Sequence, residues 1–333
     1  MLRKALGTPA VVTPRAVQWW QPPILKDDST VARQLVHKHA VEQVFVTDVR
    51  VFDDRLVTSA QLPRQHRFYN DGLTPYYDLL LVGEVVRQSL EAIAHQLMEV
   101  PFGAHFILHG MGIELLDPAA FRIYSTPTNV VSQVIPVETQ RRQSDGWLLG
   151  LTGSGDCWVA GRLAARTSFE VSFLSEESYR GLRQGAEAGP RVSEAGRRWA
   201  EAALVGRHDS ANVVIGELDL CEDCTTAVLM IDIRHPVFFD HPQDHFSGSA
   251  VLEGCRQIAV AAVASTADVP RGLLITSCHT RFHSFAELAA DVLYNAVPER
   301  TPHGTRVIVR AEQCGRLVSE AEFHFATLTE NPA

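Results

Sequence analysis

An internal duplication constrains the fold of this chain more than any other feature. Two stretches, 66–88 and 235–257, carry the same kinds of residue at one fixed shift of 169 positions, the separation of Glu84 and Glu253. The matched pairs are His66 with His235, Asp71 with Asp240, Glu84 with Glu253, Arg87 with Arg256 and Gln88 with Gln257. The shift continues upstream, where Val36, Lys38, His39, Val44 and Val46 match Val205, Arg207, His208, Val213 and Ile215. A repeat of this length predicts two copies of one structural unit.

Each stretch ends in an apolar segment that we expect to form a helix buried on most sides, about Asp78 to Met98 in the first copy and about Ser249 to Ala264 in the second. The two Glu–Arg pairs of the repeat fall inside these segments. Taking a charged group out of water costs several kcal/mol unless the group is paired or used. The alternative interpretation is a solvated i, i+3 pair, worth a few tenths of a kcal/mol. Because the pair recurs at the same place in two apolar helices, a functional site is favoured.

Within each copy a pair of strands precedes the helix and several strands follow it. This order predicts an α+β protein with two antiparallel sheets, each wrapped around a long central helix. Pairing the two units covers the edge strands and the exposed part of each helix. The expected divisions are an N-terminal arm at 1–30, a first domain at 31–175, a linker at 176–204 with a helix from Ser193 to Leu204, and a second domain at 205–330.

The charge and the apolar content of the chain exclude several classes of partner. The net charge is −9 and the basic residues are scattered, so the sequence has no basic cluster of the kind that binds nucleic acid or an anionic membrane. No apolar run approaches the roughly 20 residues that span a bilayer. The N-terminus is interrupted by prolines and is too weakly apolar for a secretory signal. The six cysteines do not have the spacing of a disulfide framework, so we expect a cytoplasmic protein.

Two short motifs raise the alternative of a metal site. Cys221 and Cys224 form a CxxC motif, but a zinc site needs a second ligand pair of suitable spacing. The other copy has Phe52 and Arg55 at these positions, so a hairpin turn is the preferred interpretation. The loop 240–245 contains imidazole and carboxylate groups, which are common metal ligands, but short polar loops often carry such residues. We expect neither a metal nor another cofactor.

Three motifs spread over both copies are specific enough to indicate a family. They are Val36–Lys38, His235–His245 continuing into Gly248 and Glu253–Gln257, and Phe282–Leu288. In these motifs the chain resembles the A-factor biosynthesis family, the γ-butyrolactone synthases of actinomycetes, which are built as tandem hotdog domains. The second helix start is also similar to that of the hotdog dehydratases, where a Gly precedes a catalytic Glu by five residues, as Gly248 precedes Glu253. Where family members often have Pro-Gly before this helix, this chain has Ser247-Gly248.

The resemblance implies a double hotdog fold and an acyl transfer. A β-ketoacyl group would leave a thioester carrier, either acyl carrier protein or coenzyme A, for the hydroxyl of dihydroxyacetone phosphate. The ester would then cyclise to a butenolide phosphate, a precursor of γ-butyrolactone, butenolide or furan-type signalling molecules. The protein would be a monomer with a pseudo-dimeric core or a homodimer.

Tandem hotdogs place two pseudo-equivalent sites at the junction of the domains, and divergence of the loops is expected to leave one active. Burial in an apolar helix is expected to raise the pKa of a Glu and to make it a usable base. Arginine is suited to a phosphate because its planar fork binds two oxygens. Amides at a helix start, near Gly248, can stabilise an oxyanion. The candidate catalytic residues are therefore Glu84, Arg256 and Glu253, and the candidate substrate-binding residues are Arg87, Gln88, Gln257, Asp240, His241, His245 and Gly248.

Two other classes of function remain open at this stage. A hotdog thioesterase or dehydratase would use the same Glu with water or with a hydroxyacyl group. A non-catalytic regulator would bind an acyl thioester or a lactone and release no thiol. The paired arginines favour a phosphorylated acceptor and therefore the transferase.

Overall fold

The structure is a computed structural model that describes residues 22–186, 195–221, 224–266 and 273–327. The first half contains β1 (Val46–Phe52), β2 (Arg55–Leu62), α1 (Leu79–Leu97), β3 (His105–Leu115), β4 (Thr128–Arg141), β5 (Leu148–Val159) and β6 (Arg162–Leu174). The second half contains β7 (Ile215–Leu220), β8 (Thr225–Leu229), β9 (His245–Phe246), α3 (Gly248–Thr266), β10 (Leu273–Phe282), β11 (Ala286–Glu287), β12 (Leu293–Thr301), β13 (Gly304–Gln313) and β14 (Arg316–Thr327). Helix α2 (Glu176–Leu182) lies between the halves in the chain.

The predicted duplication is confirmed by matching elements and matching contacts. Helices α1 and α3 begin and end at residues that differ by the same 169 positions as the sequence repeat. The side chain of Gln88 accepts from the backbone N–H of Phe45 at 2.9 Å and donates to the carbonyl of Gln43 at 2.7 Å. Gln257 makes the same two bonds in the second half, from Val214 N–H at 2.9 Å and to the Asn212 carbonyl at 2.8 Å. The repeat therefore preserves how each helix is fixed to its own strands.

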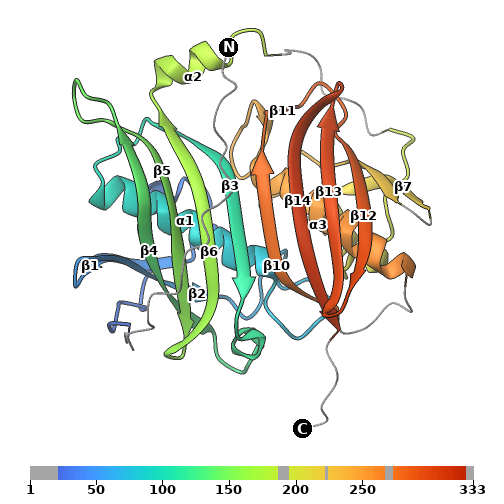
Figure 1. The fold of residues 1–333 in the computed structure, drawn as a ribbon, viewed down its shortest axis with the longest axis horizontal. Coiled ribbons are helices and arrows are strands. Elements are labelled where there is room, and N and C mark those ends of the chain that lie inside the picture. The colour runs from blue at the N-terminus through green and yellow to red at the C-terminus, as the bar shows by residue number, and fades with distance from the viewer. Residues whose placement is uncertain (1–21, 187–194, 222–223, 267–272, 328–333) are drawn as a thin grey trace.

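One sheet runs through both halves, in contrast to the two separate sheets that the sequence predicts. Its twelve strands have the order β1-β2-β4-β5-β6-β3-β10-β14-β13-β12-β8-β7, and all neighbours are antiparallel (Figure 1). The halves join where β3 pairs with β10, from Glu114 opposite Ser277 to Gly110 opposite Arg281. Each half leaves one long edge strand with unpaired backbone groups, and pairing these two edges satisfies both. The expected α+β class is correct, but the halves share a sheet.

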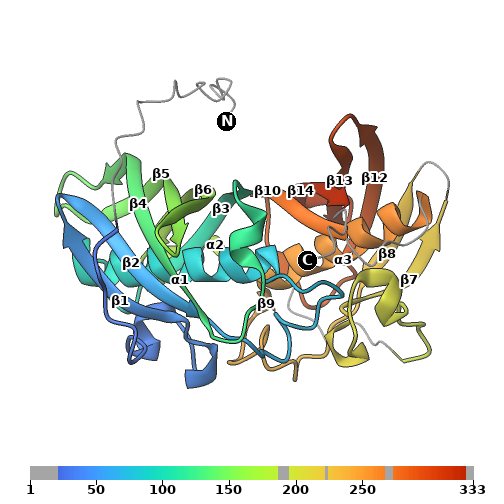
Figure 2. The ribbon, with the colours of Figure 1, turned by 90° about the horizontal axis from the view of Figure 1, so that it is seen from below.

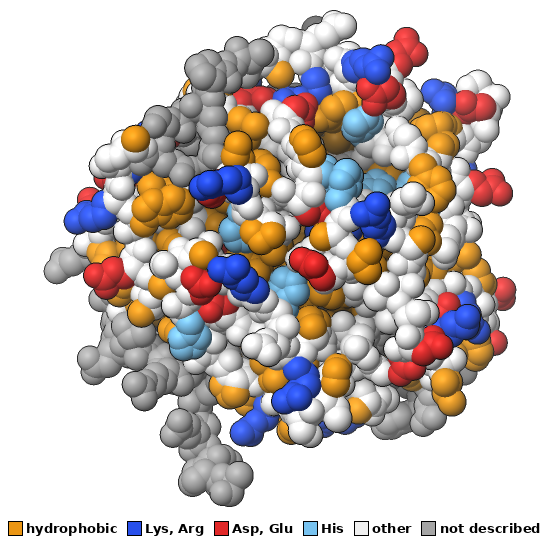
Figure 3. Space-filling model, turned by 180° about the vertical axis from the view of Figure 1, so that it is seen from behind, with side chains coloured by type: hydrophobic (Ala, Val, Ile, Leu, Met, Phe, Trp, Pro, Cys, Tyr) orange, Lys and Arg blue, Asp and Glu red, His pale blue; other side chains and the backbone are white. Residues whose placement is uncertain are grey.

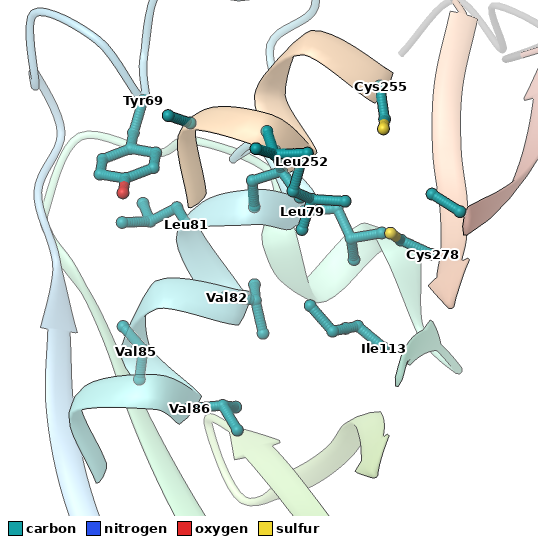
Figure 4. Packing of buried hydrophobic residues seen from close by; sticks show 14 of the residues in the cluster. Tyr69, Leu79, Leu81, Val82, Val85, Val86, Ile113, Leu252, Cys255 and Cys278 are labelled. Atoms are coloured by element: carbon teal, nitrogen blue, oxygen red, sulfur yellow. The ribbon is translucent and has the colours of Figure 1, made fainter. Parts of the chain in front are cut away.

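The two long helices lie against one face of this sheet, one in each half, and extend outward from the middle in opposite directions (Figures 1 and 2). In Figure 2 the outer strands β1, β2, β7 and β8 curve down beside the helices. The buried core is continuous across the junction: Leu79, Val82 and Ile113 of the first half lie close to Leu252, Cys255 and Cys278 of the second (Figure 4). The helices thus meet at their N-terminal parts, where the charged residues of the repeat lie.

The segment between the halves differs from its predicted form. The expected helix from Ser193 to Leu204 is wrong for its described part, where 195–201 is irregular and a 3-10 turn covers Ala202–Val205. Ser193 lies outside the described residues. Trp199 instead forms a β-bridge with Gly216. This polar, Gly-containing sequence is therefore held by backbone contacts to the second half.

Two smaller expectations concern the CxxC motif and membrane spans. The backbone N–H of Cys221 donates to the carbonyl of Cys224 at 3.1 Å, where the paired strands β7 and β8 are connected. The two central residues of the predicted hairpin turn, 222 and 223, lie outside the described residues. In the described part of the chain, no helix has the length and apolar character needed to cross a membrane.

Candidate functional site

A pocket opens at the junction of the halves, between the N-terminal parts of α1 and α3. Its charged lining residues are Glu84, Arg87 and Glu253. Apolar side chains from both helices, from β3 and β10, and from two loops form most of the remaining lining: Phe68, Tyr69, Leu80, Leu108, Met111, Phe238, Leu252 and Phe282. Gly83, Gly248 and Ser249 complete the lining. An apolar cleft with a few convergent charged groups suits a ligand with an apolar chain and a polar head.

In the first half, an ion cluster is built around the carboxylate of Glu84. Arg87 donates to both of its oxygens, at 2.8 and 2.7 Å, and the Lys38 ammonium lies 3.0 Å from Oε1. Gln88 donates to the same oxygen at 2.8 Å. Burial opposes ionisation of Glu84, but the two cations outweigh it and hold the pKa of this carboxyl well below its usual range.

In the second half, the equivalent cluster surrounds Glu253. Arg256 donates to it at 2.8 and 2.9 Å, and Arg207 donates at 2.7 and 3.2 Å. Gln257 adds a bond of 2.6 Å. Burial again opposes ionisation, but the two guanidinium groups lower the pKa of Glu253 to about 2. The expectation of a raised pKa is therefore wrong for both Glu84 and Glu253, because each buried carboxylate faces two cations.

The two clusters differ in their access to solvent. The side chain of Arg207 is 0% exposed and that of Arg256 is 5% exposed. Their counterparts in the first half, Lys38 and Arg87, are 10% and 27% exposed. The cations of the first cluster are therefore the more exposed, and of these four cations Arg87 is the one that lines the pocket.

Glu91, one turn beyond Arg87, is a further buried carboxyl of the first cluster. Its Oε1 accepts from Arg87 and lies 3.6 Å from Nδ1 of His37. Its Oε2 is buried without a hydrogen-bond partner. Burial raises the pKa of Glu91, and Arg87, which Glu91 shares with Glu84, offsets this effect only in part. On its other side, His37 Nε2 lies 2.7 Å from Nε2 of His95.

The structure separates the remaining predicted residues into three environments. Gln88 and Gln257 do not line the pocket, since their amides bond to backbone and to the glutamates. Asp240 accepts from the backbone N–H of His39 at 3.0 Å and from His241, whose ring stacks on His39 with centroids 4.9 Å apart. These contacts place the loop of the second half against the start of the first.

His245 lies in a different cluster, beside α2. Its Nδ1 is 2.6 Å from Asp244, which also accepts from Arg183 at 3.1 Å. Arg183 donates to both oxygens of Glu287, at 2.6 and 2.8 Å. His245 is therefore engaged where α2 contacts the second half.

On the face opposite the sheet, histidines gather with basic and acidic side chains over the middle of the molecule (Figure 3).

A comparison of the sequence with models of protein families shows which family the chain belongs to. The model of the A-factor biosynthesis hotdog domain matches residues 19–175 and again residues 194–329. The chain belongs to the A-factor biosynthesis hotdog family. The resemblance seen in the sequence is thereby confirmed.

Several curated relatives of this A-factor family chain are named 2-oxo-3-(phosphooxy)propyl 3-oxoalkanoate synthase. One from Streptomyces virginiae is 31% identical over 275 residues, covering 81% of this chain and 88% of the relative. One from Streptomyces coelicolor is 30% identical over 311 residues, covering 91% of this chain and 92% of the relative. One from Streptomyces griseus is 28% identical over 287 residues, covering 84% and 89%.

Solved structures agree with the hotdog fold of the family. A protein described as an oleoyl thioesterase from Lactobacillus plantarum has a TM-score of 0.52 and 12% identity, and the match covers 84% of this chain and all of the other. A protein described as a thioesterase II from Thermobifida fusca has a TM-score of 0.52 and 14% identity, covering 85% of this chain and 96% of the other. At these identities the likeness concerns the fold alone.

In this A-factor family chain, sequence reasoning missed Lys38 and Arg207 as members of the clusters. Both residues follow the 169-position repeat, which is the signal that identifies them. Asp78 was also missed, although it precedes α1 and faces the second cluster. Among the described residues, no group of three or more His, Cys, Asp or Glu side chains is placed to hold a metal ion.

Proposed function

We propose that this protein is an acyltransferase that moves a β-ketoacyl group from a thioester carrier to the hydroxyl of dihydroxyacetone phosphate. The observation that carries the proposal is the pocket, in which an apolar lining leads to Arg87, the most exposed cation of the two clusters. The printed name of the relatives describes the ester of a 3-oxoalkanoate with a phosphooxypropyl group. The apolar lining suits the acyl chain of such an ester, and the cations suit its phosphate.

In the proposed reaction, the hydroxyl oxygen attacks the carbonyl carbon of the thioester. A carbon–oxygen bond forms, the carbon–sulfur bond breaks, and the hydroxyl proton ends on the sulfur of the released thiol. Because its pKa lies well below the usual range, Glu84 stays ionised and accepts a hydrogen bond from the attacking hydroxyl. It orients this oxygen while the departing sulfur takes the proton.

The start of α3 supplies the second part of the proposed mechanism. Gly248 and Ser249 line the pocket. The first N–H groups of a helix have no partner within the helix and lie at the positive end of its dipole. We assign them to the oxyanion of the tetrahedral intermediate. Lys38 and Arg87 then remain for the phosphate.

Other residues act at a distance from the reacting atoms in this proposal. Glu253 lines the pocket, and Arg256 holds it from behind as a positioning residue. Asp240 and His241 contact His39, the residue that follows Lys38 in the chain. Through this contact they shape the end of the site that receives the substrate. His245 contributes to the docking of α2.

The wider setting of the enzyme follows from the same proposal. The domains would span 31–175 and 205–330, and the thioester would come from acyl carrier protein in the cytoplasm. A monomer already contains both halves of the pocket, so a homodimer is not needed to complete the site.

The experiment is to incubate the purified chain with a β-ketoacyl thioester, with and without dihydroxyacetone phosphate, and to measure thiol release. Mass spectrometry then identifies the phosphorylated ester. Thiol release is expected to depend on dihydroxyacetone phosphate, and Glu84→Gln is expected to lower it roughly 100-fold. Glu114→Gln, at an exposed position on β3, is the matched control. Equal thiol release without the acceptor would instead identify a thioesterase, which uses water.

A further inference from the structure

The two ion clusters share one framework but differ at the residue that precedes each long helix. Asp78 is the N-cap of α1, and its Oδ1 accepts from the backbone N–H of Leu80 at 2.9 Å. Its other oxygen, Oδ2, lies 3.8 Å from a nitrogen of Arg207 and 3.8 Å from a nitrogen of Arg256. A carboxylate of the chain therefore faces both buried guanidinium groups of the second cluster.

The equivalent residue of the first cluster is neutral. The 169-position shift carries Asp78 onto Ser247, which directly precedes α3. The Ser247 hydroxyl accepts from the backbone N–H of Ala250 at 3.3 Å and lies 3.0 Å from the hydroxyl of Ser249. The helix start is thus capped in both halves, but only one cap carries a charge.

Both acids of the first cluster come from the same long helix as Arg87. Glu84 and Glu91 are both on α1, and Glu91 is absent from the pocket lining. Glu91 is also the residue that the shift carries onto Val260, so the second cluster has no such acid. The second cluster therefore has its extra carboxylate at the helix start, whereas the first has it one turn beyond the arginine.

The two clusters also differ in the side chain at the position that covers a cation. Phe68 lies over the guanidinium of Arg207, with 4.2 Å from its centre to the ring centroid. The residue that matches Phe68 in the repeat is Val237, a smaller side chain. The guanidinium of Arg207 is therefore covered by an aromatic ring and faces Asp78, whereas the matching positions of the repeat hold Val237 and Ser247.

We propose that Asp78 is the built-in anion of the second cluster, and that the matching space beside Ser247 in the first cluster receives the phosphate of the substrate. This inference rests on the proposed function and assigns its chemistry to the first of the two pseudo-equivalent clusters. By the repeat, the cations of that space are Lys38 and Arg87, which match Arg207 and Arg256. Ser247 determines specificity because its neutrality leaves the space to an external dianion.

The test measures binding of dihydroxyacetone phosphate without any thioester, so that it does not depend on transferase activity. Ser247→Asp places a carboxylate at the start of α3, as Asp78 does at α1, and is expected to weaken binding about 30-fold or more through like-charge repulsion. Ser247→Asn is the matched control, because Asp and Asn cap helices equally well and only the charge differs. It is expected to change the dissociation constant less than about threefold.

A second variant tests the other cluster. Asp78→Asn keeps the cap but removes the anion that faces two buried arginines, so its melting temperature is expected to fall below that of the wild type. An unchanged melting temperature would show that Asp78 does not act as the anion of this cluster. Equal binding by Ser247→Asp and wild type would overturn the inference. Binding of dihydroxyacetone phosphate without any acyl transfer would instead overturn the proposed function alone. A wild type that binds neither dihydroxyacetone phosphate nor inorganic phosphate would overturn both.

Discussion

Glu84, Glu91 and Glu253 are three carboxyl groups buried to a similar degree, and their surroundings determine their charge. Glu84 and Glu253 each face two cations, and the pKa of each is lowered. Glu91 has only a share of Arg87, and burial raises its pKa. The number of cations per carboxylate therefore decides the sign of the shift, since desolvation acts on all three in the same direction.

The lowered pKa values of two histidines that match in the repeat, His66 and His235, predict that stability depends on pH. Nδ1 of His66 accepts from the backbone N–H of Phe68 at 3.2 Å, and Nδ1 of His235 accepts from that of Val237 at 3.3 Å. Burial lowers the pKa of both rings to about 4, from 6.5. Because the folded pKa lies below the unfolded value, the unfolded chain takes up protons first as the pH falls. This contribution to stability is complete above about pH 6.5 and is lost as the pH falls toward 4.

The measurement is the melting temperature from about pH 7.5 to about pH 4.5. The double variant His66→Asn/His235→Asn keeps an acceptor near each Nδ1 position but cannot take up a proton. Its melting temperature is expected to fall less steeply than that of the wild type over this range. The pKa of His37 is also lowered, to about 3, so the flattening is partial. Parallel curves for variant and wild type would contradict the prediction.

At the residue scale, the sequence predicts which charges are buried but not how they ionise. The repeat of Glu84 and Arg87 at Glu253 and Arg256 indicates a buried charged site, and the structure places these residues where the helices meet. The second cation of each cluster comes from a loop 46 residues earlier in the chain. Its distance from the carboxylate depends on tertiary packing, which local spacing does not give.

At the scale of the elements, the helices are the part that the sequence predicts best. The expected segments, Asp78 to Met98 and Ser249 to Ala264, differ by at most two residues from α1 and α3 at either end. Apolar residues nearly all round a long segment leave few alternatives to a buried helix. The strands are visible as alternating segments, but their order in the sheet depends on pairings between distant residues, such as those of β3 with β10.

The packing of α3 on β12 gives a prediction for Gly254. A Cβ atom at this position would lie 2.3 Å from the hydroxyl oxygen of Tyr294 and 2.5 Å from its Cζ. Tyr294 is buried and donates to the carbonyl of Val251 at 3.1 Å, so its ring has little room to move. In an exposed helix, Gly→Ala stabilises by about 1 kcal/mol. Here overpacking reverses the sign, and Gly254→Ala is expected to lower the free energy of unfolding by about 1–2 kcal/mol.

Gly83→Ala is the matched control on the other long helix. Its nearest neighbours would be the side-chain ends of Ile113, at 2.8 Å, and Met111, at 3.2 Å. These ends can turn away, so the loss in urea unfolding is expected to be smaller than for Gly254→Ala by about 1 kcal/mol. Equal losses at the two positions would show that the contact with Tyr294 does not govern the result.

At the scale of the whole molecule, the duplication has produced a pseudo-dimer whose interface is a sheet. The shared sheet, the continuous core and the pocket all cross the junction between the halves. Sequence reasoning predicted that the halves pair, because each alone leaves an edge strand and part of a helix exposed. It did not predict edge-to-edge pairing, since two sheets stacked on their helices would satisfy the same hydrophobic pattern. Glycines 110 and 112 in β3 mark the contact, because both face β10 across the junction.

A shared sheet and core predict that the chain unfolds in one cooperative transition, with calorimetric and van't Hoff enthalpies that agree. Gly112 tests the role of the junction, because a Cβ there would lie 2.5 Å from Nδ1 of His279 and 2.5 Å from the hydroxyl of Ser168. Gly112→Val is expected to weaken the pairing of β3 with β10 and to lower stability by about 1–3 kcal/mol, with the transition broadened or split into two. Gly103→Val, where a Cβ would meet no atom within 4 Å, is expected to keep a single transition. Two separate transitions in the wild type would mean that the halves are stable independently, and the junction would then not carry the cooperativity assigned to it.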